Sequence, residues 1–246
     1  ADQMEALTAA RETARRALQL WIKTQFDPGN GSDCGLTLGY AARDLASDRA
    51  AAVPCLLEIF DHGLTRSTGL WSHADRPAPT KGQWVLPLMS SVDPPTALRL
   101  YRVVAKKSPP GSEERIRAEL EVAKLGGDEP LPNLVEFLAQ AAGADSPGRR
   151  TLMLEIAGVL AERDYVAAGS AVRGLAGTLP ATNTVIPVYV AQLSRDTRQL
   201  QQLARTSGSA SIAVHALLRI GRRDLVAQLA ADPKNAFANV ARDSLR

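Results

Sequence analysis

Two stretches of this 246-residue chain share one internal order: an amphipathic segment, a glycine-containing turn and a second amphipathic segment. The first stretch runs from Ser112 to Ala142 and the second from Ser209 to Ala231. Neither helix of such a pair can bury its apolar face alone, so pairs of this kind are stabilised by stacking on their neighbours. The recurrence predicts an all-α fold in which antiparallel helical hairpins stack into an α-solenoid. An irregular helical bundle is the alternative.

The first pair shows where its helices should begin and end. Ser112 can cap a helix whose first turn carries two glutamates, and Gly126 can adopt the left-handed backbone that ends one. Apolar residues recur between them at helical spacing, as Ile116, Leu120, Ala123 and Leu125. The polar residues between them, including Glu119, are expected to face solvent or neighbouring turns. Pro130 and Pro132 then fit the first turn of a second helix, whose apolar positions are Leu131, Leu134, Val135, Leu138 and Ala142.

The second pair repeats this order with Gly221 at its turn and ends at Asp232-Pro233. Leu125-Gly126 and Ile220-Gly221, each between leucine-rich and alanine-rich helices, resemble the turns of HEAT-like helical repeats of bacterial proteins. The resemblance covers about half the chain. It implies a scaffold that binds other proteins, although some HEAT-like proteins are enzymes. His215, on the apolar helix before this turn, is expected to be packed among neighbours.

The rest of the chain is interpreted as parts of the same single domain, 1–246. Residues 1–62 are expected to form an N-terminal cap and a first hairpin, 63–95 an irregular loop, and 96–246 regular hairpins. Apolar periodicity from Pro147 onward predicts further helices around 152–160, 166–175, 185–193 and 196–204. A content of only 4% aromatic residues, with 45% hydrophobic residues overall, suits close helix packing through small side chains.

The predicted loop 63–95 contains the residues that are most suggestive of a binding site. Long connections in helical arrays often carry binding residues, and Trp71, His73, Asp75 and Trp84 are the candidates here. The tryptophans could equally pin the loop onto the helices. Asp61, His62, His73 and Asp75 could nominally form a metal or acid/base site, but no motif fixes their geometry. The polar stretch FDPGNGSDCG lacks the spacing of a calcium loop, and no cofactor is indicated.

Cys34 and Cys55 are the two cysteines of the chain. The first residues, Ala-Asp-Gln, would fit an exported protein after removal of a signal peptide, and in that compartment the two cysteines would form a disulfide. A periplasmic or otherwise exported location is therefore expected. The alternative is a cytoplasmic protein with two buried thiols, and an artificial boundary would explain the first residue equally well. A run of about 18 apolar residues, which a membrane span needs, does not occur.

A net charge of +3 is small for this length, and acidic residues are interspersed among the basic ones. Nucleic-acid binding is therefore not required, although Arg149 and Arg150, or Arg219 with Arg222 and Arg223, could contact phosphates. Solvated helix ends are the simpler interpretation of these arginines. Arg149 and Arg150 are also candidates for contacting a protein.

These patterns favour a non-enzymatic scaffold, inhibitor or immunity-type protein that binds another protein through a solenoid surface. An enzyme with an acid/base site near residues 61–84 and a HEAT-like nucleic-acid binder are the competing hypotheses. An enzyme requires convergent titratable groups, a nucleic-acid binder requires a basic stripe, and a protein scaffold requires an exposed apolar patch with a polar rim.

Overall fold

The computed structural model describes residues 53, 56, 57, 60, 85–140, 147–179, 183–206 and 208–246. Every regular element within these residues is helical, so the chain is all-α as predicted. Two compact units divide the chain, Ala1–Lys107 and Ser108–Arg246. The single domain expected from the sequence stays a prediction. None of the described helices is both long enough and apolar enough to cross a bilayer.

The first unit contributes two described helices, α4 (Leu86–Val92) and α5 (Pro94–Lys107), which pack on each other. Asp93 joins them: its backbone N–H donates to the Met89 carbonyl, and one of its carboxylate oxygens accepts from the Thr96 hydroxyl at 2.9 Å. The predicted loop 63–95 is therefore wrong for its last ten residues. Prolines at 87, 94 and 95 lie in the first turns of α4 and α5, where proline is compatible with a helix. Residues 63–84 lie outside the described part.

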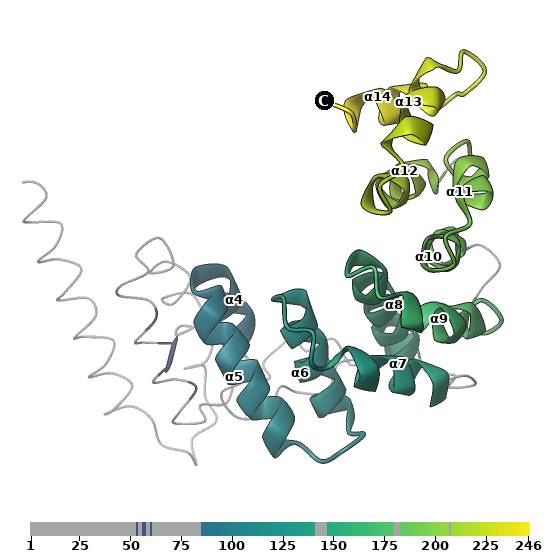
Figure 1. Ribbon diagram of the computed structural model, residues 1–246. Helices are drawn as coiled ribbons and strands as arrows, with labels where there is room; N and C mark the ends of the chain where they lie inside the picture. The colour runs from purple at the N-terminus through teal and green to yellow at the C-terminus, as the bar shows by residue number, and fades with distance from the viewer. Residues whose placement is uncertain are drawn as a thin grey trace, which may run out of the picture. The chain divides into compact units, whose positions relative to one another are not determined.

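Nine α-helices and one short 3₁₀ helix make up the described second unit, and they follow one another through space in chain order (Figure 1). Their bounds are α6 (Glu113–Lys124), α7 (Leu131–Gln140), α8 (Pro147–Glu162), η2 (Val166–Ala168), α9 (Gly169–Leu175), α10 (Ile186–Leu193), α11 (Thr197–Leu203), α12 (Ala210–Arg219), α13 (Arg223–Ala231) and α14 (Ala238–Asp243). The start of α6 is confirmed, because the Ser112 hydroxyl accepts from the Arg115 backbone N–H at 3.3 Å. The stop before Pro233 is confirmed as well, since Asp232 caps α13.

Four helices of this unit, α6, α8, α10 and α12, end in the same turn. A residue with left-handed backbone follows each of them, and these residues are Gly126, Asp164, Arg195 and Gly221, with φ of 101°, 51°, 58° and 79°. The next residue donates its N–H to a carbonyl five positions back, as in Gly127 to Val122, Tyr165 to Leu160, Asp196 to Ala191 and Arg222 to Leu217, at 2.8–2.9 Å. This bond satisfies a carbonyl that the helix end would leave unpaired. The turn expected at Gly126 and Gly221 thus occurs twice more without glycine.

The helices that precede these turns pack on one another as well as on their sequence neighbours. Contacts join α6 to α8, α8 to α10, α10 to α12 and α12 to α14. Two groups of buried apolar side chains fill the space, one from α6 to α10 and one from α10 to α14. Helix α10 supplies both groups, with Ile186 and Leu193 in the first and Val188 and Ala191 in the second. Its sequence IPVYVAQL is apolar on more than one side because both sides are covered.

Polar contacts link successive turns along the edge of this unit. The Arg163 guanidinium donates to the Gly126 carbonyl at 3.1 Å and pairs with Asp128, and the Arg195 guanidinium pairs with Asp164 at 2.6 Å. A buried bond lies further inside, where Gln192 Nε2 of α10 donates to the Ala161 carbonyl of α8 at 2.7 Å. Gln192 is only 1% exposed, so this bond ties α10 to the end of α8 away from bulk solvent.

One sequence prediction about solvent exposure is wrong, that for His215. Glu119, expected to face solvent or neighbouring turns, is only 5% exposed, and its Oε1 accepts from Arg115 Nε at 2.9 Å and from Asn133 Nδ2 at 3.0 Å. The neighbouring helix α7 supplies Asn133, which the period of α6 alone could not reveal. His215 was expected to be packed but is exposed, with its Nδ1 2.8 Å from the Ser211 carbonyl of the same helix.

Candidate functional site

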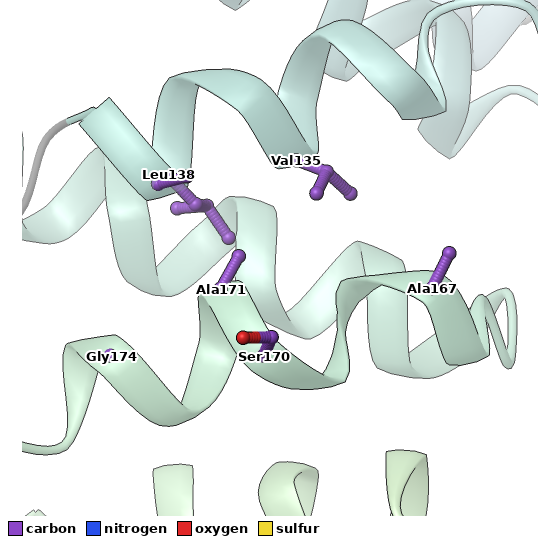
Figure 2. Close-up of a pocket in the computed structure, with 7 residues that line it drawn as sticks. Val135, Leu138, Ala167, Ser170, Ala171 and Gly174 are labelled. Atoms are coloured by element: carbon purple, nitrogen blue, oxygen red, sulfur yellow. The ribbon is translucent and has the colours of Figure 1, made fainter.

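An open groove runs between α7 and the η2–α9 segment (Figure 2). It has a volume of about 340 Å³ and is lined by Val135, Leu138, Ala139, Ala167, Ser170, Ala171 and Gly174. Figure 2 shows Val135 and Leu138 directed from α7 toward α9, and Ala167 and Ala171 directed back. Ala139, Ala167, Ser170 and Gly174 are exposed, whereas Leu138 is buried and forms the floor. The groove is therefore accessible from solvent and predominantly apolar.

Small side chains on α9 keep this groove open. The helix buries Val172 and Leu175 against the first apolar group, and its Gly169 lies close to α10, because a Cβ there would stand 3.7 Å from Leu193 Cβ. The groove side of the same helix carries only Ser170, Ala171 and Gly174. A Cβ built at Gly174 would meet no atom within 4 Å, so space is open above this position. Larger residues here would fill the groove from within the chain.

Apolar surface continues beyond the groove on one side, and charged residues flank it on both. Val166, next to Ala167, is 49% exposed. Glu136 on α7 and Arg173 on α9 are exposed, and each lies one turn from a lining residue, Ala139 and Ser170 respectively. An exposed apolar surface with a polar rim is typical of a site that binds a partner.

The lining has no acid/base or metal chemistry of its own. Its seven residues include no titratable side chain, and the Ser170 hydroxyl is their only polar side-chain group. Activation of a serine nucleophile needs an adjacent base, which this lining lacks. Across the described part of the chain, moreover, no group of three His, Cys, Asp or Glu residues is arranged to hold a metal ion. This groove is suited to holding an apolar surface.

Titratable groups converge elsewhere, around Tyr189 on α10. Burial raises the pKa of the Tyr189 hydroxyl, Glu162 at the end of α8 raises it further, and Arg219 at the end of α12 opposes the rise. The ring lies across Gly158, where a Cβ would stand 3.3 Å from the hydroxyl oxygen. A phenol with a raised pKa keeps its proton at neutral pH. The contact of the Tyr189 ring with Gly158 packs α10 against α8.

The two predicted site residues that fall in the described part do not line the groove. Arg149 lies at the start of α8 with its guanidinium carbon 5.3 Å from the centre of the Phe137 ring, a cation–π contact that ties α8 to α7. Arg150 is half-buried on the same helix. Trp71, His73, Asp75 and Trp84, together with Cys34, Cys55, Asp61 and His62, lie outside the described residues. A binding role for these residues stays a prediction.

Sequence reasoning missed the groove residues themselves. Ala167, Ser170, Ala171 and Gly174 recur at spacings of three and four, and this small-residue pattern was the available signal. In the sequence, glycines 169, 174 and 177 predict either points of close helix approach or breaks between short helical pieces. Gly169 fits the first interpretation, while Gly174 faces the groove.

Comparison with protein-family models, curated proteins and solved structures gives no match for this chain.

Proposed function

We propose that this chain is a helical-repeat scaffold of the α-solenoid type that binds another protein through the groove between α7 and α9. The repeated turn after α6, α8, α10 and α12, and the packing of these helices on one another, support the solenoid part of the proposal. A HEAT-like family relationship, an exported location and an inhibitor or immunity-type role are consistent with it and belong to the same proposal.

The exposed apolar groove is the observation that carries the binding function. A lining of Val135, Leu138 and small side chains gains free energy when a partner's apolar side chains remove it from water. Val166 extends the area available for contact beyond the groove itself. Charged residues lie at the rim and are absent from the lining, which is the usual arrangement of protein–protein interfaces.

The charges of the second unit favour a protein partner over nucleic acid. Phosphate binding needs basic side chains that remain available to the ligand. Half of the sixteen arginines and lysines in the described part of this unit instead pair with carboxylates of the same unit: Arg115, Arg117, Lys124, Arg163, Arg195, Arg205, Arg222 and Arg246. Such pairing lowers the number of basic side chains that are available to phosphates.

Recovery of partners from the native cell, followed by mass spectrometry, tests this function. The wild-type chain should recover a specific protein, and Gly174→Leu should lose it, because the leucine adds bulk at a groove position where a Cβ would meet no atom within 4 Å. Ala227→Leu is the matched control, an equally exposed small-to-large change on α13. Circular dichroism should show both variants folded. Recovery of the same protein by Gly174→Leu would show that the groove is not the binding site.

A further inference from the structure

The groove offers an incoming chain almost no hydrogen-bonding partners. Its lining comes from helices, whose N–H and C=O groups are largely used within the helix, and the Ser170 hydroxyl is the single polar side-chain group. An extended segment in the groove would place its own N–H and C=O groups against apolar atoms, which is unfavourable without compensating hydrogen bonds. A helix satisfies these groups internally. This argument favours a helical occupant.

The size of the lining side chains also suits a helix. Helix axes pack 8–10 Å apart, and the shorter distances require small residues at the contact. Ala139, Ala167, Ala171 and Gly174 provide such residues on both sides of the groove, with Leu138 as the floor. A ridge of larger apolar side chains on the partner can therefore enter between α7 and α9, in the manner of helix-in-groove recognition.

The two rims carry opposite charges. Glu136 on the α7 side is exposed, and one of its oxygens accepts from Gln140 Nε2 at 2.9 Å. Arg173 on the α9 side is exposed. Neither residue forms an ion pair within the described part of the chain. A charge at each rim is therefore available to a partner, and the two rims favour partner charges of opposite sign.

We infer that the groove binds an amphipathic α-helix of a partner protein. The apolar ridge of this helix enters the groove, with basic side chains on the flank toward Glu136 and acidic side chains on the flank toward Arg173. This inference rests on the proposed function, since it identifies the occupant of the same groove. The helical conformation is inferred from the apolar lining, and the charges of the two flanks are inferred from Glu136 and Arg173.

Synthetic peptides are the probes for this inference, with binding measured by chemical-shift changes of backbone amides in the isotope-labelled full chain. Peptide one has a leucine–alanine ridge with lysines on one flank and glutamates on the other. Peptide two has the same ridge with glutamates on both flanks. Peptide three is peptide one with a central proline, which prevents an uninterrupted helix. Peptide one should bind with shifts on α7 and α9, and peptide three should bind at least about tenfold more weakly, since a broken helix exposes unpaired backbone groups.

The flank charges are tested by exchanging one rim residue. Wild-type protein should prefer peptide one to peptide two by about two- to tenfold, the range expected for one exposed attraction replaced by one repulsion. Glu136→Lys should reverse this preference, because peptide two then faces a basic residue on both rims. Glu121→Lys on α6, outside the groove, is the control and should leave the preference unchanged.

The possible failures are distinguishable. Equal binding of peptides one and three, or no binding of any peptide, would overturn the helical occupant even where partner recovery depends on the groove. An unchanged peptide preference in Glu136→Lys would overturn the assignment of the flanks. Partner recovery that is insensitive to Gly174→Leu would instead overturn the proposed function.

Discussion

Alanine at Gly221 and alanine at Gly174 should change the free energy of unfolding in opposite directions. A Cβ at either position would meet no atom within 4 Å, so neither change introduces a clash. Gly221 has a φ of +79° in the turn after α12, and a side chain in that conformation costs about 1–2 kcal/mol. Gly174 lies inside α9 without a positive φ, where alanine is favoured over glycine by about 0.5–1 kcal/mol. The difference between the two variants should therefore be about 1.5–3 kcal/mol.

Urea unfolding followed by circular dichroism measures both free energies under one set of conditions. A shared slope of free energy against urea would show that both variants unfold the same structure. Gly221→Ala should unfold at lower urea than the wild type and Gly174→Ala at higher urea. Equal effects of the two changes, or stabilisation by Gly221→Ala, would refute the assignment of a left-handed turn at the end of α12.

Three further outcomes follow from contacts of the described residues, and a fourth tests the disulfide predicted from the sequence. Arg195→Gly should raise the free energy of unfolding in urea or leave it unchanged. Glycine removes the conformational cost of a side chain at a φ of +58°, and this gain outweighs or offsets the lost ion pair with Asp164, which is exposed and worth up to about 1 kcal/mol. Gln192→Met keeps the bulk of the side chain but removes the donor to the Ala161 carbonyl, so it should cost about 1–3 kcal/mol, whereas Gln202→Met on the exposed side of α11 should cost little. Hydrogen bonds from the Lys234 backbone N–H and from the Arg205 side chain lower the pKa of Asp232. The Asp232 carboxylate should therefore stabilise the fold above the usual aspartate pKa, and this stabilisation should be lost as pH falls through the lower pKa of the folded state. Asp232→Asn should lose less stability on acidification than the wild type. Thiol titration of the denatured chain without reductant should find no free thiol if Cys34 and Cys55 are bonded as predicted, and two free thiols would exclude that disulfide.

The helical class and two of the turns could be predicted because their signals are local. Ser112 caps α6 through its own hydroxyl, and Gly126 and Gly221 supply left-handed conformations that glycine favours. The equivalent turns at Asp164 and Arg195 could not be found in this way. There the left-handed residue has a side chain, and the pair formed by Arg195 and Asp164 becomes visible only when neighbouring helices are in place.

The groove and the buried polar contacts depend on which helices become neighbours. Glu119 lies three residues after Ile116, beside the apolar face of α6, and its burial becomes evident only with Asn133 of α7 in place. His215 follows the reverse pattern, since it sits in an apolar helix and is exposed. Gly174 is ambiguous in the sequence, because an exposed glycine in a groove and a glycine at a helix break have the same local signature. Packing between helices decides each case.

Photo-crosslinking from Ala139 tests the central claim most directly, because this exposed alanine lines the groove. A photoreactive residue at position 139 in the full chain, irradiated in its native cells, should capture one partner protein through a helical segment identified by mass spectrometry. The same residue at position 227 on α13 should not capture it. Capture from position 227 and not from 139, or equal capture from both, would contradict binding in the groove between α7 and α9.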